Sequence, residues 1–409
     1  MSLAVDEMLG LANLKHPQVR ANPYPFYAQL RSQDPIHWDE EFGFWVLTRY
    51  ADIASVYQDP RFSRAQGLQS GFEHLPASEQ TIAEPVYRCF SKTMFYSDPP
   101  YHTRLRGLVN KAFTPTAVEQ MRPYVQRTVD TLLDAMPGNG EIDFIHDFAY
   151  PLPILVISQM LGLPTEERGQ FKKWSDDLFA ILGSVPHSPE LMEGAASSLV
   201  ALTEYITKLS KARREQPRAD LLTALVEATE AGERLTQEEL VANMIILLSA
   251  GHETTINLIG NGLLALLKNP DQMQKLRDEP GLVASAVEEM MRYDNPVQIA
   301  YRSAAEDVEM GGKYIRKGQL INSILAAGNR DPEHFSEPDR FDITRDEGRN
   351  LGFGLGIHFC LGAPLVRLEA QTAFTTLLHR FPKLSLATED LEWQEHPIFR
   401  GVKSLPVEF

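Results

Sequence analysis

One stretch decides the fold of this chain: Phe353-Gly354-Leu355-Gly356-Ile357-His358-Phe359-Cys360-Leu361-Gly362. It places Cys360, one of only two cysteines in 409 residues, between glycines and beside a histidine. An amphipathic helical pattern starts directly after Cys360, so the sulfur is expected at the N-terminus of a helix. The helix dipole and the unpaired N–H groups there favour a thiolate over a thiol. Such a thiolate is a strong axial donor for an iron centre.

This stretch also allows three other interpretations. An isolated cysteine in apolar surroundings is usually a small core residue. A zinc site is excluded because Cys89 is the only other thiol and neither cysteine has paired ligand spacing. A dinucleotide loop is also suggested by Gly352, Gly354 and Gly356, but the third required glycine is absent and no strand-to-helix unit surrounds them.

The stretch resembles the haem-thiolate signature of the cytochrome P-450 family, F-G-x-G-x-H-x-C-x-G, at every fixed position. The resemblance implies that Cys360 is the axial thiolate ligand of a haem b iron. It also implies that Phe353, Gly354 and Gly362 belong to the loop that holds the cofactor.

A second motif occupies residues 98–106, with the sequence DPPYHTRLR. His102 and Arg106 are four residues apart, so they share one face of the helix that this motif begins. Taken alone, the pair would be a solvated charged stripe. The resemblance implies instead that His102 and Arg106 hold a haem propionate, together with Arg302 and His358.

The third motif lies in a predicted helix that starts at a capping box, Thr236 with Glu239, and continues to Lys268. At about 1.5 Å per residue this helix is roughly 50 Å long, enough to cross a whole domain. The sequence AGHETT occupies its middle, residues 250–255. A threonine that donates to the carbonyl four residues earlier bends a helix and opens a small notch.

Taken alone, this fragment could equally be a Gly–Thr irregularity that a buried helix tolerates without any function. A zinc-peptidase site is excluded because Ile256 stands where the second histidine is required. The resemblance implies an oxygen-activation notch. In it, Thr254 and Glu253 relay protons, and Gly251 and Ala250 leave room for O₂ and substrate.

A fourth motif is Glu289 with Arg292, which by itself would be a minor surface ion pair. The resemblance implies a buried structural pair, completed by Arg340 in the segment PDRF. The resemblance covers essentially the whole chain.

The resemblance implies a fold that is mainly α with small β-sheets, a single cytochrome P-450 haem domain over residues 1–409, with the long central helix over the haem. Residues 64–97 lack clear periodicity and are expected to form a long loop that walls the cavity. Helices are expected near residues 25–32, 50–58, 117–136, 144–162, 165–183, 190–215, 219–230 and 281–293. Strands are expected near residues 36–39, 44–47, 297–303, 307–310 and 313–322.

Composition limits the cell compartment and the partners. With 43% hydrophobic residues the chain can bury a large core, and its net charge of −16 disfavours binding to nucleic acid or anionic membranes. The N-terminus has no apolar run that would serve as a signal peptide or membrane anchor. A cytoplasmic, monomeric protein is expected.

The predicted function is a monooxygenase that inserts one atom of O₂ into a C–H or C=C bond. A peroxide-driven peroxygenase, a haem gas sensor and a domain without cofactor remain alternatives. Electrons are expected from a separate ferredoxin or flavodoxin with its reductase, because the chain has neither a flavin-binding segment nor an iron–sulfur cysteine cluster. A local basic patch is expected to dock that carrier, with the candidates Arg104, Lys111, Arg345, Arg349 and Arg367.

The predicted substrate is a sizeable lipophilic molecule, since the candidate cavity lining is almost entirely apolar. A fatty acyl chain, a terpenoid, a steroid or a macrolide would fit equally well. The candidate lining residues are Phe72, Leu75, Met94, Phe95, Phe179, Leu182, Ile246, Val297, Gln298, Ile299, Ile398 and Phe399.

Overall fold

The computed structural model describes residues 10–73, 75–137, 140–181, 188–228 and 232–409. Helices dominate it and the sheets are small, as the sequence predicts. The helices of the first half are α1 (Pro17–Ala21), α2 (Tyr24–Gln33), α3 (Tyr50–Gln58), α4 (Ala65–Glu73), α5 (Ala77–Phe90), α6 (Tyr101–Ala112), α7 (Pro115–Gln120), α8 (Arg122–Asp134), α9 (Pro151–Leu161), α10 (Arg168–Phe179) and α11 (Pro189–Glu215). Those of the second half are α12 (Leu221–Glu227), α13 (Gln237–Lys268), α14 (Pro270–Asp278), α15 (Val283–Tyr293), α16 (Leu325–Gly328) and α17 (Ala363–Arg380).

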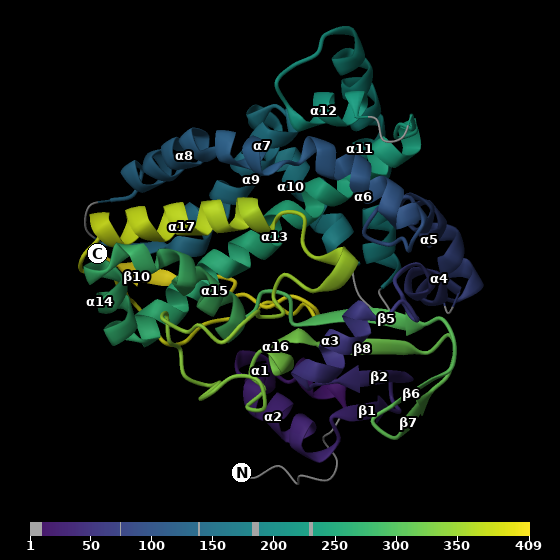
Figure 1. The fold of residues 1–409 in the computed structure, drawn as a ribbon. Coiled ribbons are helices and arrows are strands. Elements are labelled where there is room, and N and C mark those ends of the chain that lie inside the picture. Colours follow the sequence, from purple (N-terminus) through teal and green to yellow (C-terminus); the bar gives the residue numbers. More distant parts are fainter. Residues whose placement is uncertain (1–9, 74, 138–139, 182–187, 229–231) are drawn as a thin grey trace.

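The largest sheet has five strands in the order β1-β2-β8-β5-β3. Its strands are β1 (Ile36–Asp39), β2 (Phe44–Leu47), β3 (Phe62–Ser63), β5 (Ile299–Ala304) and β8 (Leu320–Ile324). β2 pairs with β8 in parallel and the other neighbours are antiparallel. This sheet lies below the helical part in Figure 1. The remaining strands are β4 (Glu141–Asp143), β6 (Val308–Met310), β7 (Lys313–Ile315), β9 (Ser385–Leu386) and β10 (Pro406–Glu408).

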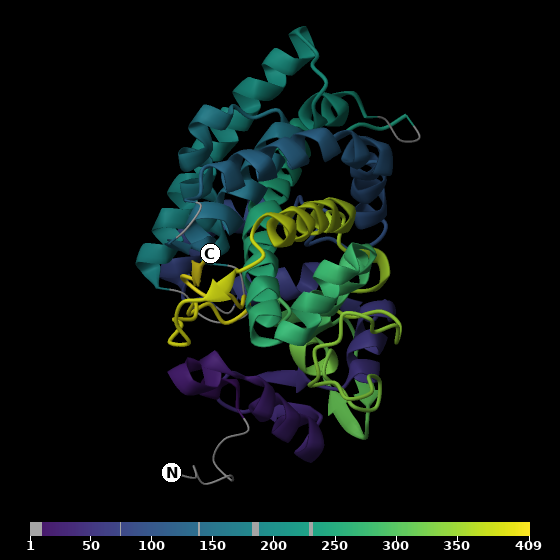
Figure 2. The same cartoon turned by 90° about the vertical axis from the view of Figure 1, so that its left-hand side faces the viewer.

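The central element is α13, whose 32 residues begin at the predicted capping box. Thr236 accepts from the Glu239 N–H at 3.2 Å, and Glu239 accepts in return from the Thr236 N–H at 2.9 Å. Most of α13 is buried, because α9, α10, α11, α15 and α17 all contact it. Figure 2 shows α13, in green, running through the middle of the molecule. An apolar helix buried on all sides is therefore the scaffold on which the other helices pack.

The expectation of a long loop at residues 64–97 is wrong, because α4 and α5 occupy most of it. Ala83, Val86 and Phe90 are the buried face of α5, and their spacing of three and four residues is helical. Pro85 inside α5 obscured this pattern. The strand expected at 313–322 is instead two strands, β7 and β8, with Gly318 in a left-handed conformation (φ 85°) between them.

A buried ion pair fixes the segment that precedes the cysteine loop. Arg292 donates from Nε to Glu289 Oε2 at 2.7 Å and from Nη2 to Glu289 Oε1 at 2.8 Å. Its remaining N–H groups donate to the backbone carbonyls of Asn329, Pro338 and Arg340. All five guanidinium N–H groups are therefore used, which compensates for burying the charge.

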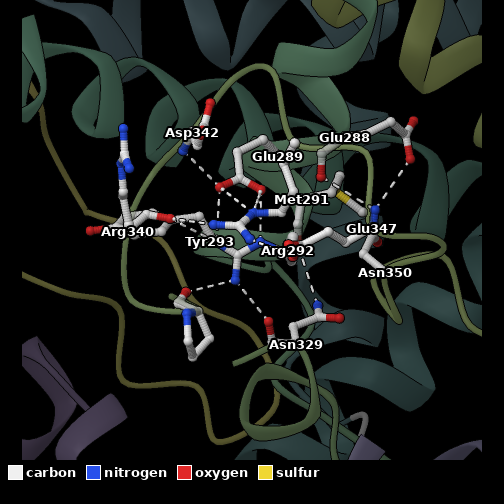
Figure 3. A network of polar contacts seen from close by, with 12 residues as sticks. Glu288, Glu289, Met291, Arg292, Tyr293, Asn329, Arg340, Asp342, Glu347 and Asn350 are labelled. Carbon is white, nitrogen blue, oxygen red and sulfur yellow. Dashed lines mark hydrogen bonds and ion pairs between the residues drawn. The ribbon is translucent and has the colours of Figure 1, made fainter. Parts of the chain in front are cut away.

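The predicted third member of this network, Arg340, is wrong. Its side chain is 57% exposed, pairs with Glu337 and contributes only its backbone carbonyl to Arg292. Figure 3 shows its guanidinium turned away from Glu289. Arg345 takes the predicted place: its side chain is 8% exposed and its Nε lies 3.3 Å from Glu289. The Asp342 N–H donates to Glu289 at 2.9 Å, so the segment after Arg340 lies against this carboxylate and Arg345 is within its reach.

The network generates a stability prediction with a matched control. Arg345→Met should destabilise the protein by about 3 kcal/mol, because it removes one partner from a buried carboxylate that keeps its other contacts. Arg340→Met should change stability by less than about 0.5 kcal/mol, since that side chain forms a surface ion pair. Denaturant unfolding of both variants measures the difference, and equal effects would contradict the assignment of Arg345.

Candidate active site

The loop before α17 holds Cys360 in a fixed backbone frame. The Cys360 N–H donates to the Phe353 carbonyl at 2.9 Å. Gly354 and Gly356 both have left-handed φ values, 69° and 68°, which favour glycine. A Cβ at Gly356 would also lie 2.4 Å from the Tyr57 carbonyl oxygen, so α3 could not approach the loop if that residue had a side chain.

The electrostatics of Cys360 differ from the expectation based on the helix N-terminus. Burial raises the pKa of the thiol, although the N–H groups of Gly362 and Ala363 and the charge of Arg106 act in the opposite direction. The backbone donors alone therefore do not make a thiolate. A metal cation bound to the sulfur would supply the missing stabilisation, because a coordinating thiol loses its proton.

Cys360 and the middle of α13 line one cavity from different sides. Phe353, Gly354 and Gly362 lie around the sulfur, and Ala250, Gly251 and Thr254 of α13 line the same cavity. Its remaining lining is largely apolar. The sequence motifs around residues 250–255 and 353–362, more than a hundred residues apart, are therefore brought to a single site.

Arginine and histidine side chains gather at this cavity. Arg106, Arg302 and His358 line it, and the His102 ring lies 4.3 Å from the His358 ring. Burial, followed by the charges of Arg302 and Arg64, lowers the pKa of His358 to about 2. Burial and Arg64 likewise lower the pKa of Arg302 to about 9.

None of these four residues forms an ion pair with a carboxylate within the described ranges. A group that brings its own two carboxylates would relieve the crowding of positive charge. Together with the thiol of Cys360, this donor set fits haem.

The notch predicted in α13 is present. The Thr254 hydroxyl donates to the Ala250 carbonyl at 3.1 Å, four residues earlier. Gly251 lines the cavity, and there is a second reason why a small residue is needed at this position. A Cβ there would lie 2.9 Å from Ile157, so glycine also allows α9 to pack closely against α13.

The comparison with known families matches this geometry. A family model described as Cytochrome P450 covers residues 55–398. The chain belongs to the cytochrome P450 family. Members of this family carry haem iron held by a cysteine thiolate.

Known relatives and solved structures are similar to this chain along nearly its full length. Cytochrome P450 107B1 of Saccharopolyspora erythraea is 44% identical, with 93% of each chain covered. Cytochrome P450 monooxygenase PikC of Streptomyces venezuelae is 43% identical, with 95% of this chain and 91% of that protein covered. The crystal structure of P450BioI in complex with hexadec-9Z-enoic acid ligated acyl carrier protein has a TM-score of 0.89 and 38% identity. It covers 96% of this chain and 99% of P450BioI.

This cytochrome P450 is therefore an oxidoreductase of the monooxygenase class, as the sequence predicts. The family assignment favours that activity over a peroxygenase or a gas sensor. Across the ranges that the structure describes, no helix combines the length and the apolar character needed to cross a bilayer.

The predicted substrate residues include some that line the cavity, some that do not, and one outside the described residues. Gln298 is turned away from the site and lines a neighbouring cavity, which shares Ile299, Ile398 and Phe399 with the first. Phe72 and Leu75 do not line the site, since Phe72 stacks on Tyr87 between α4 and α5. Leu182 lies outside the described residues. Eight of the twelve line the cavity of the P450 site: Met94, Phe95, Phe179, Ile246, Val297, Ile299, Ile398 and Phe399.

Glu253 does not line the cavity of this P450. It accepts a hydrogen bond from Gln394 at 3.1 Å and lies in a cluster with His252 and Asp176 of α10, whose ligand atoms are within 4.8 Å of one another. Such a cluster could hold a cation, but Lys172 already forms an ion pair with Asp176. Through His252, the cluster links α13 to the Asp176 side chain of α10, which is partly exposed to solvent.

Sequence reasoning missed several lining residues, including Tyr57, Tyr96, Ile157, Tyr301 and the buried Arg64. No motif marked them. Arg64 directly follows strand β3, and only the three-dimensional pairing of β3 with β5 brings it beside Arg302.

The low pKa of His358 generates a prediction for the haem-free protein. The unfolded chain binds a proton at His358 below about pH 6.5, whereas the folded protein does not until about pH 2. Stability should therefore fall as the pH falls, by about 1.4 kcal/mol between pH 7.5 and 5.5 from this residue. Denaturant unfolding at both pH values should show this loss reduced in His358→Gln but kept in the exposed control His16→Gln. An unchanged loss in His358→Gln would show that His358 is not the residue responsible.

Proposed function

We propose that haem b binds in the cavity between the Cys360 loop and α13, and that Cys360 is its axial ligand. The observation that carries this proposal is that the thiol and the Thr254 notch border one largely apolar cavity. Four basic residues lie at its edge and form no ion pair with a carboxylate among the described residues. When bound, haem would supply O₂ activation and transfer of one oxygen atom to a C–H or C=C bond.

In this proposal the residues of the chain have separate tasks. His102, Arg106, Arg302 and His358 hold the haem carboxylates by charge-assisted hydrogen bonds. The Thr254 hydroxyl, with Glu253, moves protons to the oxygen-binding side of the cavity. The Thr254 hydroxyl uses its proton to donate to the Ala250 carbonyl. The lone pairs of its oxygen can therefore accept a hydrogen bond from a group in the cavity.

The substrate of the proposed reaction is lipophilic. Met94, Phe179, Ile246 and Ile398 line the cavity with apolar side chains, and no aspartate or glutamate lines it among the described residues. P450BioI, 38% identical to this chain, is seen with a hexadecenoic acyl chain on its carrier protein. A long-chain acyl group, free or carried by a protein, is therefore the first substrate class to test.

We infer that electrons come from a separate ferredoxin or flavodoxin. The two cysteines of this chain cannot form a four-cysteine iron–sulfur site. Of the docking candidates, Arg345 is excluded by its buried pair with Glu289. Arg104 and Arg367 are largely neutralised by Glu239 and Glu288. Lys111 and Arg349 are exposed, and both remain candidates for docking the carrier.

The proposed function is tested by the spectrum of the reduced protein with carbon monoxide. Wild type should give the Soret band of a haem-thiolate protein, and Cys360→Ser should lose it, because an alcohol is a poor anion at neutral pH. Cys89→Ser is the matched control and should keep the band. Product formation should then require NAD(P)H with a ferredoxin or flavodoxin system. Turnover driven equally well by peroxide alone would favour the peroxygenase.

Thr254→Ala should keep haem and substrate binding but lower the product formed per NAD(P)H consumed by about tenfold or more, because a positioned proton donor typically contributes at least that much. Thr254→Ser keeps the hydroxyl and should retain most of the coupling. The quantities to measure are product and hydrogen peroxide per NAD(P)H. Equal coupling in Thr254→Ala and wild type would show that Thr254 is only a helix residue.

A further inference from the structure

Arg64 is a buried arginine of the cavity that no motif of the chain explains. Its residue is 4% exposed, and it lies between β3 and α4. The guanidinium carbon lies 4.0 Å from the centre of the Phe95 ring and 5.2 Å from those of Tyr96 and Tyr301. Three aromatic faces therefore hold the charged group in place without neutralising it.

Arg64 and Arg302 converge on one acceptor. The Arg64 Nη1 group donates to the Tyr301 carbonyl at 3.0 Å, and the Arg302 Nη1 group donates to the same oxygen at 2.9 Å. Two buried guanidinium groups thus share one neutral oxygen. Like charges this close are unfavourable unless an anion lies beside them.

The charge of the neighbouring acid, Asp98, acts on Arg302, but its carboxylate forms no ion pair with either guanidinium among the described residues. The Asp98 carboxylate accepts from the hydroxyl of Ser63 and from the backbone N–H groups of Arg64 and Ala65. These bonds cap the start of α4. No ion pair joins the Arg64 guanidinium to a carboxylate in the part of the chain that the structure describes.

The cavity has one arginine more than haem has carboxylates. Arg64, Arg106 and Arg302 line it, and the lining residues include no aspartate or glutamate. Haem would bring two propionates, so three guanidinium groups would face two carboxylates. Arg64 would therefore either add hydrogen bonds to a propionate or bind one further anion.

We propose that Arg64 binds a carboxylate inside the cavity. This carboxylate belongs either to a haem propionate or to the acid group of an acidic lipophilic substrate, and its planar, bidentate geometry suits a guanidinium. The proposal rests on haem binding at Cys360. Purified protein without haem would reject the proposed function itself, whereas normal haem content would leave Arg64 to be tested separately.

The first arm of the test measures haem retention in the holoenzyme. Transfer of haem to excess apomyoglobin should be about 10- to 100-fold faster in Arg64→Gln than in wild type if Arg64 binds a propionate, as expected for loss of a charged hydrogen bond. Arg64→Lys keeps the charge and should recover part of the effect. Arg61→Gln removes a nearby exposed arginine and is the matched control.

The second arm measures ligand binding from the shift of the Soret band, with palmitic acid and hexadecan-1-ol as probes. If Arg64 binds the substrate carboxylate, Arg64→Gln should weaken the binding of palmitic acid about 10-fold or more. The binding of hexadecan-1-ol should stay unchanged. An effect in either arm supports the proposal and identifies the source of the carboxylate. Haem transfer and palmitic acid binding both equal to wild type would reject it. If Arg64→Gln does not fold, Arg64→Lys carries the same comparisons.

Discussion

The buried pair of Glu289 and Arg292 is the interaction on which the position of the active site depends. An arginine in the interior is costly unless every N–H finds an acceptor, and here the five donors reach one carboxylate and three backbone carbonyls. Those carbonyls belong to residues 329, 338 and 340. A single side chain of α15 therefore ties together the segment that leads from the sheet to the cysteine loop, with Arg345 binding the same carboxylate from the other end.

The charge distribution follows a clear division. The chain as a whole is strongly acidic, with a formal net charge of −16, yet the cavity beside Cys360 is lined by arginines and no carboxylate in the described ranges. An internal positive region inside a negative protein is maintained only by burial and by fixed hydrogen bonds such as those to Tyr301. The cavity is therefore preorganised for an anionic cofactor before that cofactor arrives.

The sequence predicted the parts of the site that depend on spacing within a single element. Cys360 with its glycines, the Thr254 bond to Ala250 and the His102–Arg106 face all follow from local geometry, and the structure brings them together. The resemblance implies Arg340 rather than Arg345, because a sequence motif gives the position of an arginine but not the direction of its side chain. Arg64 could not be predicted, because its role depends on the pairing of β3 with β5, residues more than two hundred positions apart.

The two walls of the cavity are assembled differently. The wall beside the sulfur is mostly one continuous segment, residues 352–366, whereas the facing wall is built from separate pieces near residues 94–96, 157, 179, 246–254, 296–301 and 398–399. A substitution in one of these pieces reshapes the space for substrate while the cysteine loop keeps its backbone bonds. Substrate preference can therefore diverge during evolution one segment at a time, under little selective penalty from the iron-binding chemistry.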